Sequence, residues 1–200
     1  MTDYATDKRR LRKEILARRG AIPTEERARR SALACTELER YFESKGLPEG
    51  SRVAVYYALG SEVDVHGFVA RARTHGWTCA FPVMLESAPD ASAQMTFWDV
   101  PARPEPRAFF SHPAKAICEN DPSLADCTPV DPAEIDAVVA PLVAFDDTGM
   151  RLGYGGGNYD RLFAQLKPSA VVCGVAFAEQ RAHAVPAEPH DAPLAHIVVA

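Results

Sequence analysis

Short apolar runs alternate with amphipathic segments along most of the chain, and this alternation limits the possible folds more than any other feature. The apolar runs cover residues 53–58, 77–83, 135–143, 171–177 and 197–199. Helical periodicity lies between some of them, as in residues 65–75 before Gly76. Buried strands separated by helices are typical of α/β proteins with a largely parallel sheet. We therefore expect one domain over residues 1–200, built as a three-layer α/β/α sandwich around a mixed, mostly parallel sheet.

A pair of helices is predicted before the first apolar run. Leu11, Ile15 and Leu16 recur on one side of residues 7–19, which predicts the first helix. The second is predicted from Thr24, as its N-cap, to about residue 45. Its predicted buried side chains are Leu33, Leu38 and Tyr41.

Positive charge is concentrated in these helices. Between Lys8 and Arg30 there are ten Lys/Arg and three Glu, a net charge of +7, which leaves −12 for the rest of a chain whose total is −5. A basic helix can bind RNA, but an acidic body of this charge opposes binding to a phosphate backbone. We therefore expect no nucleic-acid partner. Five of the ten basic residues are interpreted as solvated surface, namely Arg18, Arg19, Arg27, Arg29 and Arg30.

Composition excludes several other classes of protein. No window approaches the roughly 18–20 apolar residues of a membrane-spanning helix. The charged N-terminus does not resemble a secretory signal. Five scattered cysteines without a CxxC pair indicate neither a disulfide framework nor a zinc site. We expect a monomeric, cytoplasmic protein that does not associate with membranes.

The most informative segment is rich in glycine and lies between an apolar run and a helix predicted over 159–166. Four of five consecutive positions are glycine there, at Gly153, Gly155, Gly156 and Gly157. Such a backbone can approach a ligand closely, and a following helix N-terminus favours phosphate. Arg151 and Arg161 add charge, and Asp160 is either a helix-start carboxylate or a magnesium ligand. The alternative is a flexible turn that binds nothing. Neither the P-loop nor the dinucleotide fingerprint fits, because no Lys follows the glycines and Asn158 replaces the last glycine.

The same segment carries a resemblance to a known family. Residues 151–160 read Arg-Leu-Gly-Tyr-Gly-Gly-Gly-Asn-Tyr-Asp and resemble the R-L-G-x-G-x-G-Y-Y-D signature of 5-formyltetrahydrofolate cyclo-ligases. Residues 8–12 resemble the family's K-x-x-L-R start, residues 61–64 its E-x-[DE] element, and residues 185–191 its P-x-E-x-H-D element. These elements occur in the family's order over nearly the whole chain, although residues 86–130 match thinly.

The resemblance implies an enzyme that uses ATP and Mg²⁺ to close 5-formyltetrahydrofolate to 5,10-methenyltetrahydrofolate. The formyl oxygen would be phosphorylated first, and N10 would then displace phosphate. The implied catalytic residues are Lys8, Arg151 and Tyr154. The implied ATP-binding residues are Lys8, Arg9, Arg10, Leu11 and Arg12, together with Arg151, Leu152, Gly153, Tyr154, Gly155, Gly156, Gly157, Asn158 and Tyr159. The implied folate-binding residues are Leu59, Glu62, Asp64, Tyr154, Gly155, Gly156, Gly157 and Asn158, and the implied Mg²⁺ ligands are Asp160 and Asp191.

Some alternatives stay open at this stage. Asp64 is equally well interpreted as a cap of the helix after Val65, and His190 with Asp191 as a simple turn. Asn158 replaces the family's usual Tyr, and Ala195 its usual Asp, which affects substrate fit more than chemistry. A relative that binds folate or nucleotide without catalysis is the main alternative function. It would be expected to have lost Lys8 or Asp160, and both are present.

Overall fold

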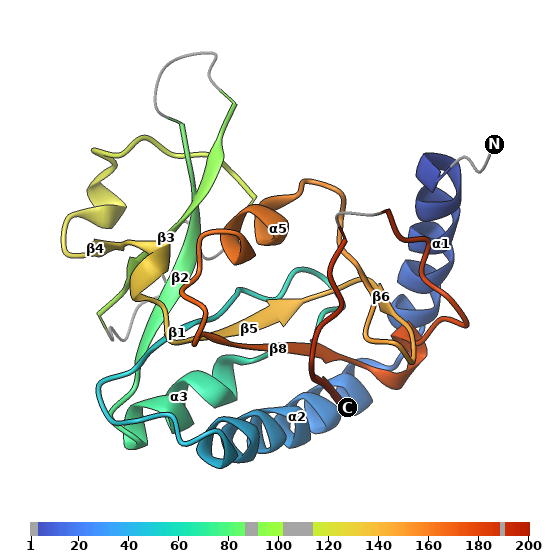
Figure 1. Ribbon diagram of the computed structural model, residues 1–200, viewed down its shortest axis with the longest axis horizontal. Coiled ribbons are helices and arrows are strands. Elements are labelled where there is room, and N and C mark those ends of the chain that lie inside the picture. The colour runs from blue at the N-terminus through green and yellow to red at the C-terminus, as the bar shows by residue number, and fades with distance from the viewer. Residues whose placement is uncertain (1–3, 87–91, 102–113, 189–190) are drawn as a thin grey trace.

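The structure is a computed structural model that describes residues 4–86, 92–101, 114–188 and 191–200 (Figure 1). Its α-helices are α1 (Tyr4–Gly20), α2 (Thr24–Ser44), α3 (His66–Thr74) and α5 (Asn158–Phe163). Its strands are β1 (Arg52–Ala54), β2 (Thr78–Leu85), β3 (Gln94–Asp99), β4 (Thr128–Val130), β5 (Ala137–Pro141), β6 (Ala144–Phe145), β7 (Arg151–Leu152), β8 (Val171–Ala176) and β9 (Ile197–Val199). Short 3₁₀ helices are η1 (Pro122–Leu124), η2 (Pro132–Glu134) and η3 (Ala178–Gln180).

Seven strands form one sheet in the order β4-β3-β2-β1-β5-β8-β9. The pairs from β2 across to β9 are parallel, with Val53 opposite both Cys79 and Ala137. The pairs β2·β3 and β3·β4 are antiparallel. Helix α3 makes the crossover from β1 to β2, as a parallel connection requires. The predicted mixed, mostly parallel sheet is confirmed.

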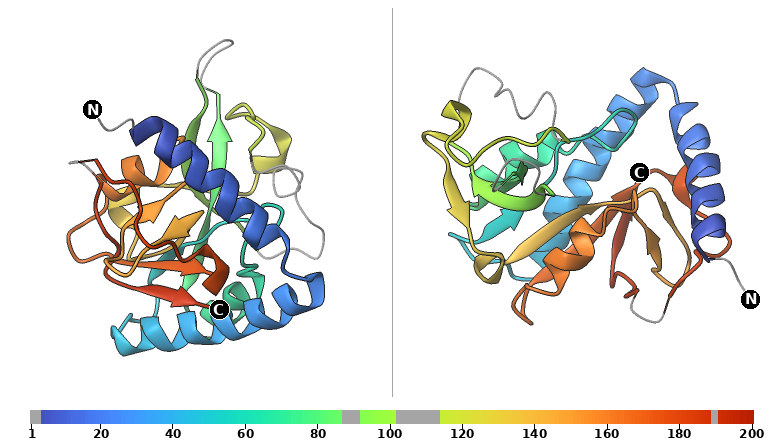
Figure 2. Two further views of the ribbon diagram at one scale, coloured as in Figure 1. Left: turned by 90° about the vertical axis from the view of Figure 1, so that its right-hand side faces the viewer. Right: turned by 90° about the horizontal axis from the view of Figure 1, so that it is seen from above.

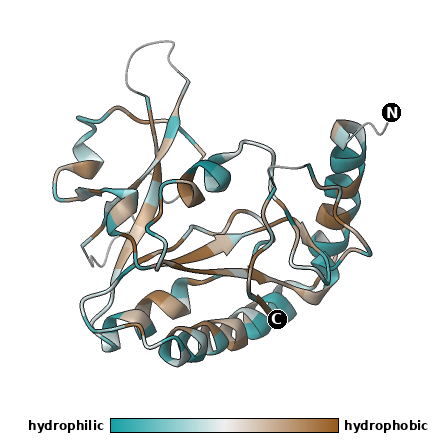
Figure 3. Ribbon diagram, in the orientation of Figure 1, coloured by the Kyte–Doolittle hydropathy of each residue, from teal (hydrophilic) through white to brown (hydrophobic). Residues whose placement is uncertain are grey.

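Helices cover both faces of this sheet, which confirms the three layers (Figures 1 and 2). On one face, Leu38 and Phe42 of α2 pack with Phe68 of α3 against the strands. On the other face, Leu162 of α5 packs on Ala54, Val138 and their neighbours. The most hydrophobic segments lie in the central strands and on the inner faces of the helices (Figure 3). The predicted N-terminal helical pair is also present as α1 and α2.

Several details of the predicted helices and strands are wrong. Leu33 is 54% exposed, because α2 turns inward a stripe at positions 31, 34, 35, 38 and 42 and position 33 falls outside it. Thr24 does not cap α2, since the N-cap residue is Pro23 and no side chain caps it. The first strand ends at Ala54, and α5 ends at Phe163. The connection from 99 to 131 contains β4 and η1, and residues 102–113 of it lie outside the described part.

Helix α1 lies apart from the two faces of the main sheet (Figure 2). Its fully buried Ile15 packs on Val143, Ala144 and Leu152, so the helix rests on the β6–β7 hairpin. This contact turns one stripe of α1 toward the glycine-rich segment. The stripe consists of Lys8, Arg12, Ile15 and Arg19, at the spacing that places residues on one helix face.

The hairpin β6–β7 divides the predicted glycine turn into two separate parts. Asp146 lies in the turn, where its Oδ1 accepts hydrogen bonds from the Thr148 and Met150 amides and its Oδ2 accepts one from the Val185 amide at 2.8 Å. Gly149 has φ +82°, and a Cβ there would lie 2.4 Å from the Leu194 carbonyl oxygen. The second part, residues 153–157, leads from β7 into α5 and is called the glycine loop below.

Candidate active site

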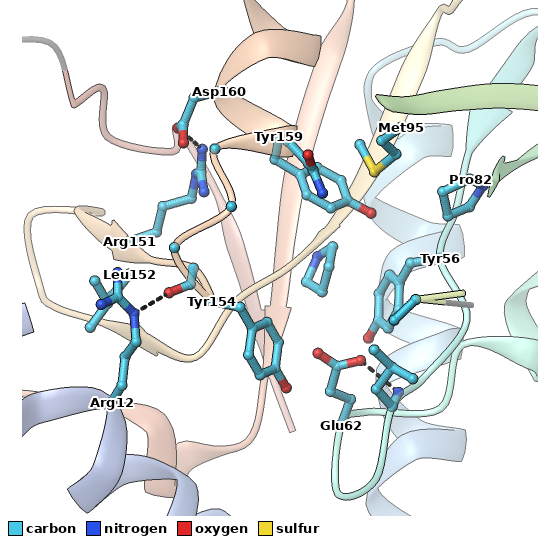
Figure 4. Close-up of a pocket in the computed structure, with 18 of the residues that line it drawn as sticks. Arg12, Tyr56, Glu62, Pro82, Met95, Arg151, Leu152, Tyr154, Tyr159 and Asp160 are labelled. Atoms are coloured by element: carbon cyan, nitrogen blue, oxygen red, sulfur yellow. Dashed lines mark hydrogen bonds and ion pairs between the residues drawn. The ribbon is translucent and has the colours of Figure 1, made fainter. Parts of the chain in front are cut away.

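A cavity of about 630 Å³ lies at the carboxyl ends of the parallel strands β1 and β5. Its walls include Tyr56 just after β1, Pro141 at the end of β5, and residues of β2 and β3 such as Pro82 and Met95 (Figure 4). The glycine loop and α1 close the other side. Open α/β sheets bind their ligands at this edge, because the strand ends and following loops leave a crevice there.

One end of the cavity is formed by the glycine loop and α1. Gly155 has φ +102° and Gly157 has φ +65°, backbone conformations that residues other than glycine rarely adopt. Arg12 Nε donates a hydrogen bond to the Gly153 carbonyl oxygen at 2.7 Å. A Cβ at position 155 would lie 3.3 Å from Arg12 Nη2, so the second glycine also makes room for the guanidinium group.

Two further arginines surround this loop. Arg151 forms an ion pair with Asp160, and its side chain is only 7% exposed. Its Nε atom is buried and has no hydrogen-bond partner among the described residues. Arg161 donates to the Gly156 carbonyl oxygen at 2.9 Å and to Asn158 Oδ1 at 2.5 Å. The loop end of the cavity therefore combines positive charge with exposed backbone, which suits an anion.

Lys8 reaches the same end from the first turns of α1. Its Nζ forms ion pairs of 2.8 Å with both Glu188 Oε2 and Asp191 Oδ2. The Glu188 amide also donates to Asp191 Oδ2, at 2.9 Å. Burial acts to lower the pKa of Lys8, but the two carboxylates outweigh it and raise the pKa above 10.5. Lys8 is therefore fully protonated at neutral pH.

The opposite end of the cavity is apolar and aromatic, with one buried carboxylate. Glu62 is 7% exposed and accepts a hydrogen bond from the Leu59 amide at 2.7 Å. Burial raises the pKa of Glu62 above 4.5, against the Leu59 hydrogen bond and the nearby Arg19 charge. The Tyr154 hydroxyl points toward Glu62 (Figure 4) and accepts a hydrogen bond from Arg19 Nη2 at 2.7 Å. This end can hold a flat, partly apolar ring system that carries N–H donors.

Most of the site residues predicted from the sequence line this one cavity. They include Lys8, Arg12, Glu62, the whole segment 151–160, and Asp191. Four do not line it. Arg9 and Arg10 are exposed on α1, and Leu11 packs against the core below α1. Asp64 is also exposed, and its Oδ1 accepts a hydrogen bond from the His66 amide at 2.9 Å. The N-cap residue of α3 is Val65 and no side chain caps the helix, so Asp64 is not its N-cap. His190 lies outside the described residues.

Sequence reasoning missed other residues around the cavity. Tyr56, Pro82, Met95 and Glu188 line it. Two signals were available: Tyr56 lies in the apolar run 53–58, and Glu188 belongs to the family-like element 185–191. The interpretation of Arg19 and Arg30 as surface is wrong. Arg19 is 2% exposed, and Arg30 forms an ion pair with Glu179 and contacts the Ala200 carbonyl oxygen. Charge runs are usually solvated, and sequence alone does not show which members a helix turns inward.

The described residues contain no cluster of three or more His, Cys, Asp or Glu side chains arranged to hold a metal. Among the same residues, no helix has the length and apolar character needed to cross a membrane.

A doubly covered α/β sheet, with a glycine loop flanked by arginines beside an aromatic cavity, is an arrangement typical of enzymes that act on small molecules. The model of the 5-formyltetrahydrofolate cyclo-ligase family matches residues 4–200, and the chain belongs to that family. The resemblance stated from the sequence and the expectation of an enzyme of this family are both confirmed.

Relatives of known name cover nearly the whole chain. A probable 5-formyltetrahydrofolate cyclo-ligase of Caenorhabditis elegans is 26% identical, over 96% of this chain and 91% of that protein. The 5-formyltetrahydrofolate cyclo-ligase of Escherichia coli K12 is 27% identical, over 92% of this chain and 95% of that protein. The structure of a 5,10-methenyltetrahydrofolate synthetase from Mycoplasma pneumoniae superposes with a TM-score of 0.72 at 25% identity, over 96% and 98% of the two chains. This likeness confirms the fold class.

Proposed function

We propose that the protein converts 5-formyltetrahydrofolate to 5,10-methenyltetrahydrofolate, with conversion of ATP to ADP and release of phosphate. The observation that carries this proposal is a single cavity with two unlike ends. The glycine-loop end offers backbone amides with Lys8, Arg12 and Arg151, and the other end offers aromatic rings around Glu62. A triphosphate suits the first end, and a reduced pterin suits the second, so the reacting groups would meet between them.

The chemistry requires an activated formyl oxygen, because an amide-like oxygen is a poor leaving group. In the proposed reaction the formyl oxygen attacks the γ-phosphorus and ADP leaves. N10 then attacks the formyl carbon, the C–O bond breaks, and phosphate departs with the original formyl oxygen while N10 loses its proton. Transfer of a phosphoryl group depends mainly on positioning and on neutralising charge.

The residues at the loop end would supply that positioning and charge. Arg151 has a buried Nε without a hydrogen-bond partner among the described residues, which a phosphate oxygen would satisfy. Lys8 is charged and lies at the cavity wall, and it would exchange Glu188 and Asp191 for phosphate oxygens. Tyr154 lies between the two ends, where its ring and the following glycines would border the formyl group.

The proposed Mg²⁺ would be held by Asp160, with Asp191 contacting it through water. Carboxylate oxygens suit this ion, and the Asp160 side chain is 56% exposed at the cavity wall. Mg²⁺ is usually bound by one or two carboxylates plus substrate phosphates, so the residues fit without a cluster of three protein ligands. When bound, the ion would neutralise phosphate charge.

The residues at the pterin end would fix the substrate. The Glu62 carboxylate would accept hydrogen bonds from N–H donors of the pterin, and Leu59 next to it would contact the ring. We propose in addition that the protein acts as a cytoplasmic monomer without nucleic-acid or membrane partners.

A direct assay tests the proposed function. The protein is incubated with 5-formyltetrahydrofolate, ATP and Mg²⁺, and the absorbance of methenyltetrahydrofolate is followed. Product that depends on enzyme and on ATP is expected. If both ligands bind but no product appears above the control without enzyme, the non-catalytic alternative is correct.

A further inference from the structure

Arg19 is a buried cation next to the cavity, and the proposed reaction gives it no role. It lies near the end of α1 and is 2% exposed, but it does not line the cavity itself. Its Nε donates to Ser61 Oγ at 3.0 Å, and its Nη2 donates to the Tyr154 hydroxyl at 2.7 Å. Its guanidinium carbon lies 6.0 Å from the centre of the Tyr154 ring. The side chain therefore joins three segments: α1, the loop that carries Glu62, and the glycine loop.

A purely structural role does not explain why a charged side chain is buried in these contacts. Removing an arginine from water costs several kcal/mol, which a nearby anion must offset. Both direct partners of Arg19 are neutral hydroxyl groups, and its Nη1 has no hydrogen-bond partner among the described residues. The neighbouring carboxylate is Glu62, next to Ser61 in the chain, and the charge of Arg19 lowers the pKa of Glu62 against the effect of burial.

The place of Arg19 on α1 indicates what it organises. Lys8, Arg12 and Arg19 share one stripe of the helix, and at 1.5 Å per residue the stripe extends about 16 Å from Lys8 to Arg19. Lys8 and Arg12 contact the glycine-loop end of the cavity, and Arg19 contacts the end that carries Glu62 and Tyr154. One rigid helix thus supports both ends of the cavity.

We infer that Arg19 is a positioning residue for the folate substrate, which holds the Tyr154 phenol in place and keeps a positive charge beside the Glu62 carboxylate. This inference rests on the proposed function, because it assigns Glu62 and Tyr154 to folate. Arg19 acts through these two side chains and does not touch the substrate. It should therefore govern folate binding and leave nucleotide binding to Lys8, Arg12 and Arg151.

Loss of the Arg19 charge should shift the pH dependence of folate binding in one direction. The groups that face Glu62 are Arg19 from α1, Tyr154 from the glycine loop, Tyr159 from α5 and Tyr56 after β1. Burial holds the pKa of each tyrosine above 10, so all three are neutral at neutral pH and Arg19 is the cation of the group. Without it, Glu62 takes up a proton at higher pH, and the acid limit of folate binding moves upward.

The test compares Arg19→Ala, Arg19→Lys and the exposed neighbour Arg18→Ala. Dissociation constants for 5-formyltetrahydrofolate and for a non-hydrolysable ATP analogue are measured by calorimetry from pH 5 to 8. We expect Arg19→Ala to weaken folate binding about tenfold and to raise its acid limit, with nucleotide binding changed less than about twofold. Arg19→Lys should restore the acid limit in part, because it keeps the charge but not the fixed fork of donors. Arg18→Ala should match the unmodified protein.

A combined variant covers the case in which Arg19→Ala does not fold. Tyr154→Phe should weaken folate binding, and the same change should have a smaller effect in the Arg19→Lys background, because the two residues act as a unit. A fall in melting temperature with unchanged folate affinity and acid limit would overturn the inference, as would independent effects of the two changes. If the unmodified protein binds folate without turnover, the proposed function fails while the Arg19 comparison still decides the inference. If it does not bind folate, both fail.

Discussion

Lys8 Nζ and Asp191 Oδ2 form an ion pair of 2.8 Å between residues 183 positions apart in the chain. The pair joins the start of α1 to the segment before β9, directly beside the glycine loop. Because Glu188 contacts the same ammonium group, Lys8 is held at the cavity wall before any nucleotide binds.

Replacing Lys8 should mainly affect ATP. Lys8→Ala removes a charged donor, and the loss of about 2–3 kcal/mol corresponds to a rise in KM for ATP or a fall in turnover of well over tenfold. Steady-state kinetics at varied ATP measures it. Lys13→Ala, an exposed lysine of the same helix, is the matched control. If Lys8→Ala and Lys13→Ala have equal kinetics, Lys8 belongs to the solvated face of α1.

The structure separates Arg12 from Arg9, although the family resemblance implies ATP contacts for both. Arg12 lines the cavity and bonds to Gly153, whereas Arg9 is exposed outside it. We expect Arg12→Ala to raise KM for ATP about tenfold and Arg9→Ala to change it less than about twofold. Equal effects of the two changes would contradict the placement of the phosphates beside Arg12.

The Glu62 carboxylate should lower the stability of the protein as pH rises and should support folate binding. Its pKa is raised in the folded protein by burial, so the folded state binds its proton more readily than the unfolded state does. Stability is therefore lost as pH rises from about 4.5 through the raised value. Glu62→Gln should remove this pH dependence, so the melting temperature should fall less between pH 4.5 and 8 than in the unmodified protein, while KM for folate rises about tenfold or more.

The control for Glu62→Gln is Glu49→Gln, at an exposed position. It should change neither the melting temperature nor KM. A Glu62→Gln protein with lower stability and unchanged KM would show that the carboxylate is structural.

Glycine substitutions should separate the two parts of the glycine-rich segment. Gly155→Ala forces a side chain into φ +102° and against Arg12, so we expect about 1–3 kcal/mol of strain and weaker ATP binding. Gly149→Ala places a Cβ 2.4 Å from the Leu194 carbonyl oxygen and should lower stability severely. Gly153→Ala meets only Arg151 Nη1 at 3.8 Å and should be tolerated. Chemical denaturation and ATP titration of the three proteins check this order, and a Gly155→Ala protein that binds ATP normally would contradict it.

Much of the fold could be predicted because its signals are local. The apolar runs that became β2, β5 and β8 carry enough buried residues to be recognised without tertiary information. The residues of the glycine signature, 151–160, likewise all line one cavity. Details that depend on packing were not predictable: Leu33 appears suitable for a core, but the inward stripe of α2 excludes it.

The apolar end of the cavity was harder to predict than the glycine-loop end. Its walls come from β1, β2 and β3, where Tyr56, Pro82 and Met95 resemble ordinary core residues in the sequence. Arg19 belongs to a charge run, and only the contact of Ile15 with the β6–β7 hairpin turns its stripe inward. The role of Asp146 was likewise not predicted: its carboxylate fixes the hairpin before the glycine loop.

The central claim is that the formyl oxygen leaves on phosphate. It is tested most directly with 5-formyltetrahydrofolate whose formyl oxygen carries a heavy-oxygen label, incubated with the protein, ATP and Mg²⁺. Mass spectrometry of the released phosphate should find one labelled oxygen for each methenyltetrahydrofolate formed. Product formation with the label in water instead, or no product at all, would contradict the account.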